Sequence, residues 1–356
     1  MADRKRERED LRKEASRIEA EIVTQLDARA EVAKKIAEIN VEDPATKNFV
    51  DNAEVERLAE ASSGAMPRES LVQVLRTIQA NVGAIEQPLG VLYVGPDGGA
   101  AHAAVRQRFG AMCRAVSVES TQAALDGVVR QGELAVLPYE TREDGSVQAT
   151  MLALSRSEGR IVSCFEVVHH TDLVNKTGNI ADVERIYAIG TQHATCAGFL
   201  GTHFAKVPVL DVKSPLLAAR FAAEDHGAAA FADRVFEGEL GLAVVRRDIR
   251  DDGEERVRYV VVGTRPSPRT GRDRSVIAIS VADSPGALHE VLKAFAEREI
   301  NLTKIQSRPV PGDSWKYIFF LEIEGHTTDR NMVQALDDVK RLTKFFRVLG
   351  SYEASS

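Results

Sequence analysis

The hydrophobic pattern of the chain changes twice along its 356 residues, and these changes limit what it can fold into. Between Leu11 and about Ile85 the apolar residues recur at steps of three and four, which is the period of amphipathic helices. From Gly90 onward short β-type runs alternate with helical stretches, and from Ser275 onward the alternation follows a compact βαββαβ order. The pattern therefore predicts three modules: one all-helical, one α/β and one small α+β module.

The helical module is expected to hold three helices. The first carries Leu11, Ala15, Ile18, Ile22, Leu26, Ala33 and Ile36 on one stripe. Asp43-Pro44 interrupts it, a second helix carries Val55 and Leu58, and a third begins at Pro67 and runs to about Glu86. One helix of this length cannot easily bury its stripe within a small monomer, so we expect a homodimer or a dimer of dimers.

Composition excludes several classes of protein. The chain has 46 Lys plus Arg against 53 Asp plus Glu, and a net charge of −7 gives no general attraction to nucleic acid or anionic lipid. It has no apolar run of membrane-spanning length, and eight of its first ten residues are charged, so we expect a cytoplasmic protein. The three cysteines, Cys113, Cys164 and Cys196, lack CxxC spacing, and we expect buried thiols and no metal site.

The last 80 residues predict a ferredoxin-like layer of two helices on a sheet. The expected elements are strand 276–281, helix 285–298, strands 302–307 and 317–323, helix 329–342 and strand 346–349. Before them, residues 265–274 are rich in Pro, Gly and Arg and are expected to form a linker.

Two motifs in this last module resemble the phenylalanine-binding pair of ACT domains. They are Gly286-Ala287-Leu288 and Gln306-Ser307-Arg308-Pro309, where the family usually has Glu at the position of Gln306. Independently, a turn at Gly286 would expose backbone N–H groups to a carboxylate, although a helix start capped by Asp283 or Ser284 explains the same residues.

Together with the order of the modules, these motifs make the chain resemble bifunctional chorismate mutase and prephenate dehydratase with a C-terminal ACT domain. The resemblance implies a chorismate-mutase-like domain (1–88), a two-lobed dehydratase-like domain (89–264), the linker (265–274) and an ACT domain (275–356). It also implies L-phenylalanine as effector, a chorismate- or prephenate-like diacid as ligand, and no cofactor.

In the first module the resemblance points to Arg12 and Arg29 as substrate-binding residues. Arg29 lies on or near the apolar stripe and would need an anionic partner if buried. Arg12 lies 17 residues upstream, roughly 25 Å along a helix, so the two could share a ligand only across a dimer. The family's catalytic Lys aligns with Asn40, which removes a cation from the site. Its final Gln aligns with Glu86, which is also a candidate for substrate binding. Weak mutase activity is expected.

The second module shows similar losses. The loop Gly95 to His102 resembles the first dehydratase loop but has Gly99 and Ala101 where the family carries hydroxyls. The segment from Leu137 to Val147 keeps Glu140 and Gly145 but has Thr141 and Arg142 in place of Asn and Ser. Val257-Arg258-Tyr259 stands where the family has Thr-Arg-Phe, so the position of a hydroxyl donor is apolar.

Candidate substitutes for the lost groups are few. The candidate catalytic residues, chosen by residue type and position in the sequence, are Arg142, Thr191, Ser214 and Arg258. Glu140 and Arg258 are also expected to bind substrate. Histidine can also act as a general acid, and the candidates by residue type alone are His102, His169, His170, His193, His203 and His226.

Two functions remain open at this point. The first is a family member with impaired catalysis that keeps a phenylalanine-sensing or ligand-binding role, because the substitutions fall at chemical positions and spare the effector motifs. The second is an active enzyme that converts chorismate to prephenate and then to phenylpyruvate with relocated donors, under feedback by phenylalanine. A different reaction on a related diacid is a third alternative.

Overall fold

The computed structural model describes residues 2–40, 52–62, 64, 66–86, 90–110, 113–142, 145–236, 241–310 and 313–354. They divide into two compact units, residues 1–89 with 106–114, and the remainder from Gly90 onward. Within the described residues no helix is long and apolar enough to cross a membrane. All three cysteines are buried, as expected.

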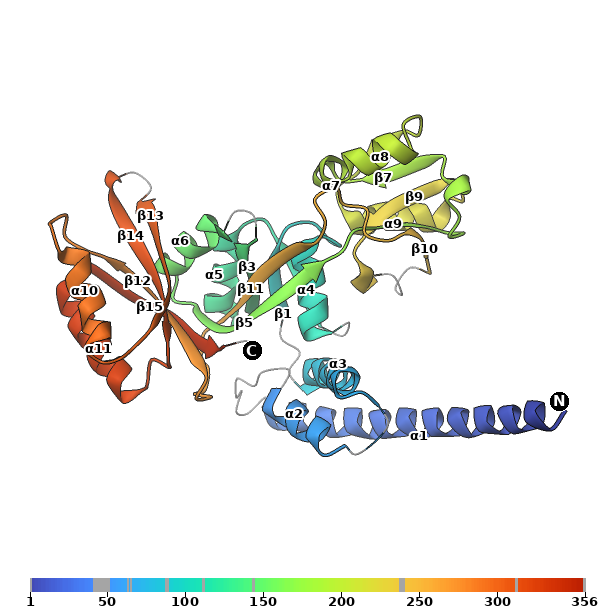
Figure 1. Ribbon diagram of the computed structural model, residues 1–356, viewed down its shortest axis with the longest axis horizontal. Helices are drawn as coiled ribbons and strands as arrows, with labels where there is room; N and C mark the ends of the chain where they lie inside the picture. Colours follow the sequence, from blue (N-terminus) through green and yellow to red (C-terminus); the bar gives the residue numbers. More distant parts are fainter. Residues whose placement is uncertain are drawn as a thin grey trace. The chain divides into compact units, whose positions relative to one another are not determined.

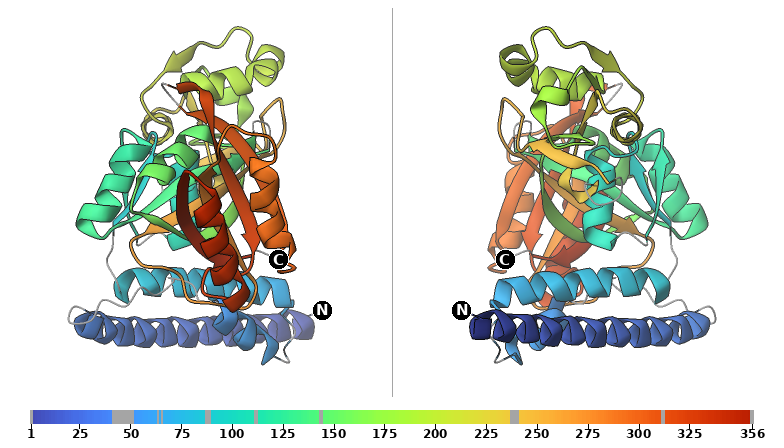
Figure 2. Two further views of the ribbon diagram at one scale, coloured as in Figure 1. Left: turned by 90° about the vertical axis from the view of Figure 1, so that its left-hand side faces the viewer. Right: turned by 90° about the vertical axis from the view of Figure 1, so that its right-hand side faces the viewer.

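The first unit contains helices α1 (Ala2–Asn40), α2 (Asn52–Glu60) and α3 (Arg68–Glu86), as the periodicity predicts. Helix α1 begins nine residues earlier than Leu11, because its charged start consists of good helix formers with spaced ion pairs such as Lys13–Glu9. Helix α3 begins one residue after Pro67, and the predicted break at Asp43-Pro44 lies outside the described residues. Helices α1 and α3 lie side by side (Figure 2).

The second unit starts with the first lobe of the predicted α/β module. Its elements are β1 (Gly90–Val94), α4 (Ala100–Phe109), β2 (Arg114–Val118), α5 (Thr121–Gln131), β3 (Leu134–Thr141), β4 (Gly145–Ser146), α6 (Gln148–Arg156), β5 (Arg160–His169) and the returning strand β11 (Glu255–Gly263). The sheet order is β5-β11-β3-β1-β2, with β11 antiparallel to both of its neighbours. Apolar residues of α5 and α6 pack on one face of this sheet.

The second lobe is inserted between β5 and β11. It comprises β6 (Asp172–Asn175), the 3-10 helix η1 (Ile180–Asp182), β7 (Arg185–Ala188), α7 (Gly190–Thr195), α8 (Ala197–His203), β8 (Val209–Asp211), α9 (Pro215–Glu224), β9 (Ala228–Ala232), η2 (Arg234–Phe236) and β10 (Ala243–Arg246). Its sheet has the order β10-β6-β9-β7-β8. Helices α8 and α9 cover opposite faces, each over its own apolar cluster (Figure 1).

The C-terminal module has the predicted βαββαβ order. Its elements are β12 (Asp273–Ser280), α10 (Ala287–Ala296), β13 (Leu302–Val310), β14 (Asp313–Glu324), α11 (Arg330–Leu342) and β15 (Phe345–Glu353). Helices α10 and α11 pack together on one face of the sheet (Figure 1). Strand β12 begins at Asp273, so the last two residues of the predicted linker belong to the sheet.

The sheet of this module continues into the first lobe, which the sequence did not predict. Strand β15 pairs with β5 at Gly350 and Ile161, so the sheets of the first lobe and of the C-terminal module form one ten-stranded sheet. A Cβ at Gly350 would lie 2.1 Å from the Ile161 carbonyl oxygen, and only glycine permits this approach. The two predicted domains are therefore joined by backbone pairing as well as by the linker.

Candidate functional site between the lobes

The loop between β1 and α4 contacts the second lobe. The Gly98 amide donates to His102 Nδ1 at 2.9 Å, and the Tyr93 hydroxyl donates to the Asp97 carboxylate. Gly98 has φ +81°, and a Cβ there would lie 2.6 Å from the Leu216 nitrogen of the second lobe. The loop therefore depends on glycine both for its backbone conformation and for close contact with the other lobe.

This loop contacts the N-terminus of α9. The Leu216 amide donates to the Asp97 carbonyl oxygen at 3.1 Å, which joins the two lobes directly. Ser214 caps this helix by accepting a hydrogen bond from the Leu217 amide at 3.2 Å. The structure thus brings Ser214, a candidate from the sequence, beside the first loop.

Strand β11 separates the residues of the Val257-Arg258-Tyr259 motif onto two faces. Its pairing with β5 is regular from Val257 to Tyr259, so Val257 and Tyr259 share one face and Arg258 lies on the other. Val257 is buried and brings no donor, as the sequence indicated.

Arg258 points toward the C-terminal module. It contacts Glu140 at 3.0 Å and Glu322 of β14 at 3.6 Å, and Lys304 of β13 lies 2.7 Å from Glu140. The structure therefore brings Glu140 and Arg258 together, but as partners of each other and of β13 and β14. Their role in binding substrate stays a prediction.

Glu322 is the most buried carboxylate of this cluster. Burial alone would raise its pKa, but hydrogen bonds from Tyr352 and Thr303, with the charges of Arg258 and Arg274, outweigh burial and hold the pKa below its usual value. The group is therefore a fixed negative charge between the first lobe and the C-terminal module.

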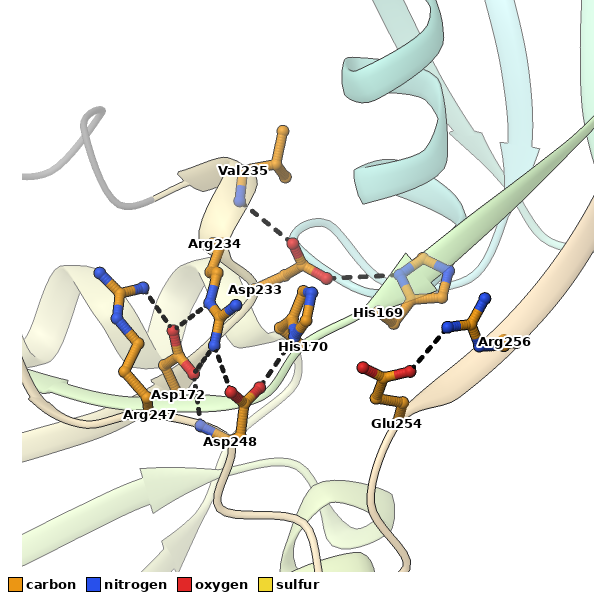
Figure 3. A network of polar contacts seen from close by, with 10 residues as sticks. All are labelled: His169, His170, Asp172, Asp233, Arg234, Val235, Arg247, Asp248, Glu254 and Arg256. Atoms are coloured by element: carbon orange, nitrogen blue, oxygen red, sulfur yellow. Dashed lines mark hydrogen bonds and ion pairs between the residues drawn. The ribbon is translucent and has the colours of Figure 1, made fainter. Parts of the chain in front are cut away.

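On the opposite face, Tyr259 begins a chain of three polar groups, of which Tyr259 and His169 are buried and Asp233 is half-buried. Its hydroxyl lies 2.9 Å from His169 Nε2. His169 Nδ1 lies 3.3 Å from the Asp233 carboxylate of the second lobe, as Figure 3 shows. Burial raises the pKa of Tyr259, and the nearby carboxylates of Glu255 and Asp233 add to the shift. Tyr259 is therefore held as a neutral hydroxyl that can donate.

The turn that carries Asp233 connects this chain to the first loop. Asp233 begins the turn that contains η2, and the ring of Phe236 lies 5.0 Å from that of His102. His102 in turn stacks on Tyr93 at 4.9 Å. One short turn of the second lobe therefore contacts both the Tyr259–His169 pair and the Gly98 loop, which places them in one region.

The connections between the lobes are fixed by a second polar network (Figure 3). Fully buried Asp172 accepts hydrogen bonds from Arg234 at 2.9 Å, Arg247 at 2.7 Å and the Asp248 amide at 2.7 Å. Asp248 also contacts His170 at 2.8 Å. These contacts hold the two segments that cross between the lobes against each other.

The remaining candidate residues lie apart from this region or contact other groups. Thr191 is exposed in α7, and Arg142 is exposed after β3. In the helical unit Arg29 pairs with Glu86 at 2.8 Å, whereas Arg12 is exposed on α1. Arg29 is exposed, so the partner expected for a buried arginine is not required, although Glu86 pairs with it.

The effector motifs occupy a helix start and an edge strand of the C-terminal module. Gly286 precedes α10 with φ +84° and no side-chain cap, and Ala287 and Leu288 form the first turn. Gln306, Ser307, Arg308 and Pro309 lie on β13, with Gln306 and Arg308 half-buried and the other two exposed. Arg308 donates to the Ser146 carbonyl oxygen of β4 at 3.1 Å, so the second motif contacts the first lobe.

Sequence reasoning missed the chain from Tyr259 to Asp233. The sequence gives His169 the same weight as several other histidines, and Tyr259 enters only as part of a motif whose first position has changed. A signal was nevertheless present, because the family's phenylalanine is a tyrosine here, which adds a hydroxyl two residues beyond the lost one.

A two-lobed α/β unit continued by a βαββαβ module is the architecture of prephenate dehydratases with an ACT domain. The sequence matches the prephenate dehydratase family over residues 91–267 and the ACT domain family over residues 275–341. The prephenate dehydratase of Arthrobacter aurescens, solved with L-Phe, shares 30% identity and a TM-score of 0.61, over 75% of this chain and 90% of that one.

Two curated relatives extend the similarity to the helical unit. The bifunctional chorismate mutase/prephenate dehydratase of Aquifex aeolicus is 31% identical over 97% of this chain and 98% of its own length. The enzyme of the same name from Neisseria gonorrhoeae is 29% identical over 94% of both chains. The chain therefore belongs to the bifunctional chorismate mutase/prephenate dehydratase family.

Proposed function

We propose that the chain is a prephenate dehydratase of the phenylalanine pathway that binds its substrate between the two lobes. The observation that carries this proposal is the hydroxyl of Tyr259, held by His169 on the face of β11 that carries Val257. Dehydration needs a donor for the departing hydroxyl, and a neutral buried tyrosine supplies one. The relatives named above support the substrate.

L-phenylalanine is the proposed effector. The relative from Arthrobacter aurescens was solved with L-Phe, and both motifs that resemble an effector site are present in this chain. The uncapped start of α10 at Gly286 offers backbone N–H groups to a carboxylate. The contact between Arg308 and Ser146 gives the second motif a direct connection to the first lobe.

For the helical unit we propose a dimerisation and ligand-binding role with weak mutase activity. Arg29 is paired with Glu86, so a diacid would have to compete with a carboxylate of the same chain. Asn40 stands where the resemblance places a catalytic lysine. A rearrangement that depends on electrostatic stabilisation loses rate when such a cation is absent.

The second candidate function is a sensor without effective catalysis. The observation that favours it is the apolar Val257, together with Gly99 and Ala101 in the first loop. In this case the chain would bind prephenate or a related diacid and L-phenylalanine without turnover.

Product analysis of the full-length protein separates the two candidates. Purified protein is incubated with prephenate or with chorismate, each beside a protein-free sample, because both substrates react spontaneously. We expect phenylpyruvate from prephenate well above the control, and little prephenate from chorismate. If folded protein yields no excess phenylpyruvate, the dehydratase proposal fails and the sensor remains. Binding of L-phenylalanine, measured by calorimetry on the same sample, tests the effector role separately.

A further inference from the structure

The central triplet of β11 differs from the family pattern at two positions on one face. By the resemblance described above, Val257 stands where the family has threonine and Tyr259 where it has phenylalanine. On this basis the hydroxyl within the triplet lies at its third position instead of its first. Residues two apart in a strand are separated by about 6.7 Å along the same face. The hydroxyl of a tyrosine, at the far end of its ring, can span such an offset, so the exchange conserves a donor while changing its position.

The surroundings of Tyr259 are those of a positioned donor. Its hydroxyl contacts His169, and His169 contacts Asp233, so each group in the chain has a partner that fixes its orientation. Phe165 also stacks on the tyrosine ring at 5.8 Å. Any buried tyrosine hydroxyl needs one hydrogen-bond partner, which His169 supplies, but packing alone does not call for the carboxylate that orients the histidine.

We propose that Tyr259 is the catalytic proton donor of the dehydration in this chain, with His169 and Asp233 as positioning residues. The assignment rests on the proposed dehydratase function and adds to it the residue that replaces the threonine.

In the proposed step, the bond between the ring and its carboxylate breaks, CO₂ leaves, and the electron pair of that bond enters the ring. The ring becomes aromatic as the C–O bond breaks, and the electron pair of the C–O bond leaves with the hydroxyl oxygen. That oxygen takes the proton of Tyr259, Tyr259 takes a proton from His169 Nε2, and solvent reprotonates His169. The products are phenylpyruvate, CO₂ and water.

Burial of the donor fits a site that closes around its substrate. Tyr259 and His169 are 2% and 4% exposed, and Asp233 comes from the second lobe. Separation of the lobes would withdraw Asp233 and uncover the histidine and tyrosine to an entering substrate. Closure would then exclude water and complete the chain of donors around the departing hydroxyl.

Four variants of the full-length protein test the assignment. Tyr259→Phe removes only the hydroxyl and restores the residue type of the family, so the protein should fold. Tyr187→Phe is the matched control, because Tyr187 packs on Phe221 within the second lobe. His169→Gln tests the positioning residue. Val257→Thr combined with Tyr259→Phe recreates the family triplet.

We expect Tyr259→Phe to lower kcat for prephenate by about 100-fold or more with little change in KM, the contribution typical of a general acid. His169→Gln should lower kcat with KM unchanged, which a loss of packing alone would not do. Tyr187→Phe should behave as wild type, and the double variant should regain much of the kcat lost in Tyr259→Phe.

Three outcomes would overturn the assignment. They are a Tyr259→Phe variant with wild-type kcat, a change confined to KM, and a double variant no faster than Tyr259→Phe. Each leaves the dehydratase function intact, because the wild-type protein would still form phenylpyruvate. A wild-type protein that forms none overturns the proposed function and this assignment together.

Discussion

At the scale of single residues, Asp172 shows how hydrogen bonds offset the cost of a buried charge. It is fully buried, and burial alone would raise its pKa, but hydrogen bonds from Arg234, the Asp248 amide and Arg247 hold the pKa below its ordinary value. A lowered pKa contributes stability above the pKa of the unfolded chain, near 3.9. That stability is lost as the pH falls through the still lower folded pKa.

We expect Asp172→Asn to lower the free energy of unfolding by about 2–3 kcal/mol at pH 7, the range for hydrogen bonds to charged groups. The measurement is urea unfolding at pH 7 and at pH 3. The difference between variant and wild type should shrink at the lower pH, where the wild-type carboxylate begins to take up its proton. Asp126→Asn, at an exposed ion pair on α5, is the control and should change stability little. An Asp172→Asn effect that is equal at both pH values would contradict the charge argument.

Residue positions also show what sequence reasoning can supply. Arg29 on an apolar stripe signals a need for an anion, but only the packing of α1 on α3 selects Glu86. Likewise, the motif around Arg258 marks a candidate functional strand, yet only the fold shows that its guanidinium contacts Glu140 of β3 and Glu322 of β14. Such partners depend on contacts between residues far apart in sequence, which periodicity does not encode.

At the scale of elements, the start of α10 offers a test of the effector site. Gly286 has φ +84°, and nothing lies within 4 Å of the position its Cβ would take. Gly286→Ala should therefore cost about 1–2 kcal/mol through backbone strain alone. We expect a larger loss in L-phenylalanine affinity than in stability, because relief of the strain would turn the N–H groups of the first turn.

Gly132 provides the matched control for that substitution. It has φ +70°, no atom lies within 4 Å of the place a Cβ would occupy, and it caps α5 far along the chain from the effector motifs. Gly132→Ala should lose similar stability and keep the affinity for L-phenylalanine, both measured by calorimetry. Equal losses of L-phenylalanine affinity in the two variants would show that Gly286 is not part of the effector site.

The same scale shows where prediction from sequence succeeded and where it ended. The C-terminal βαββαβ order followed from short segments with clear periods and turn residues between them. The pairing of β15 with β5 could not be predicted in this way, because strand pairing between two modules has no periodic pattern in the sequence. Gly350 is the one residue at this contact whose type reflects the close approach. The strands β6, β8 and β10 are only three or four residues long, too short to show a period.

At the scale of the whole molecule, the surface of α1 predicts assembly. Four large apolar side chains spaced at four and seven residues are at least 37% exposed in the single chain. They are Leu11, Ile18, Ile22 and Leu26. A second copy that covered them would remove their exposed apolar surface from water, and each side chain would contribute a fraction of the roughly 1.5–3 kcal/mol that full burial gives. In a twofold dimer each of these contributions occurs twice, which favours association.

We expect sedimentation velocity to give the mass of two chains or a multiple of it. Ile22→Asp should weaken the dimer by roughly tenfold or more, because burial of a charge replaces burial of an aliphatic group. Val129→Asp, at a similarly exposed apolar residue of α5, is the control and should leave the mass unchanged. A wild-type protein that sediments as a monomer at micromolar concentration would show that α1 is stable without a partner. In that case Arg12 and Arg29 could not share one ligand across two chains, and the helical unit would have lost its expected diacid site as well as its catalytic lysine.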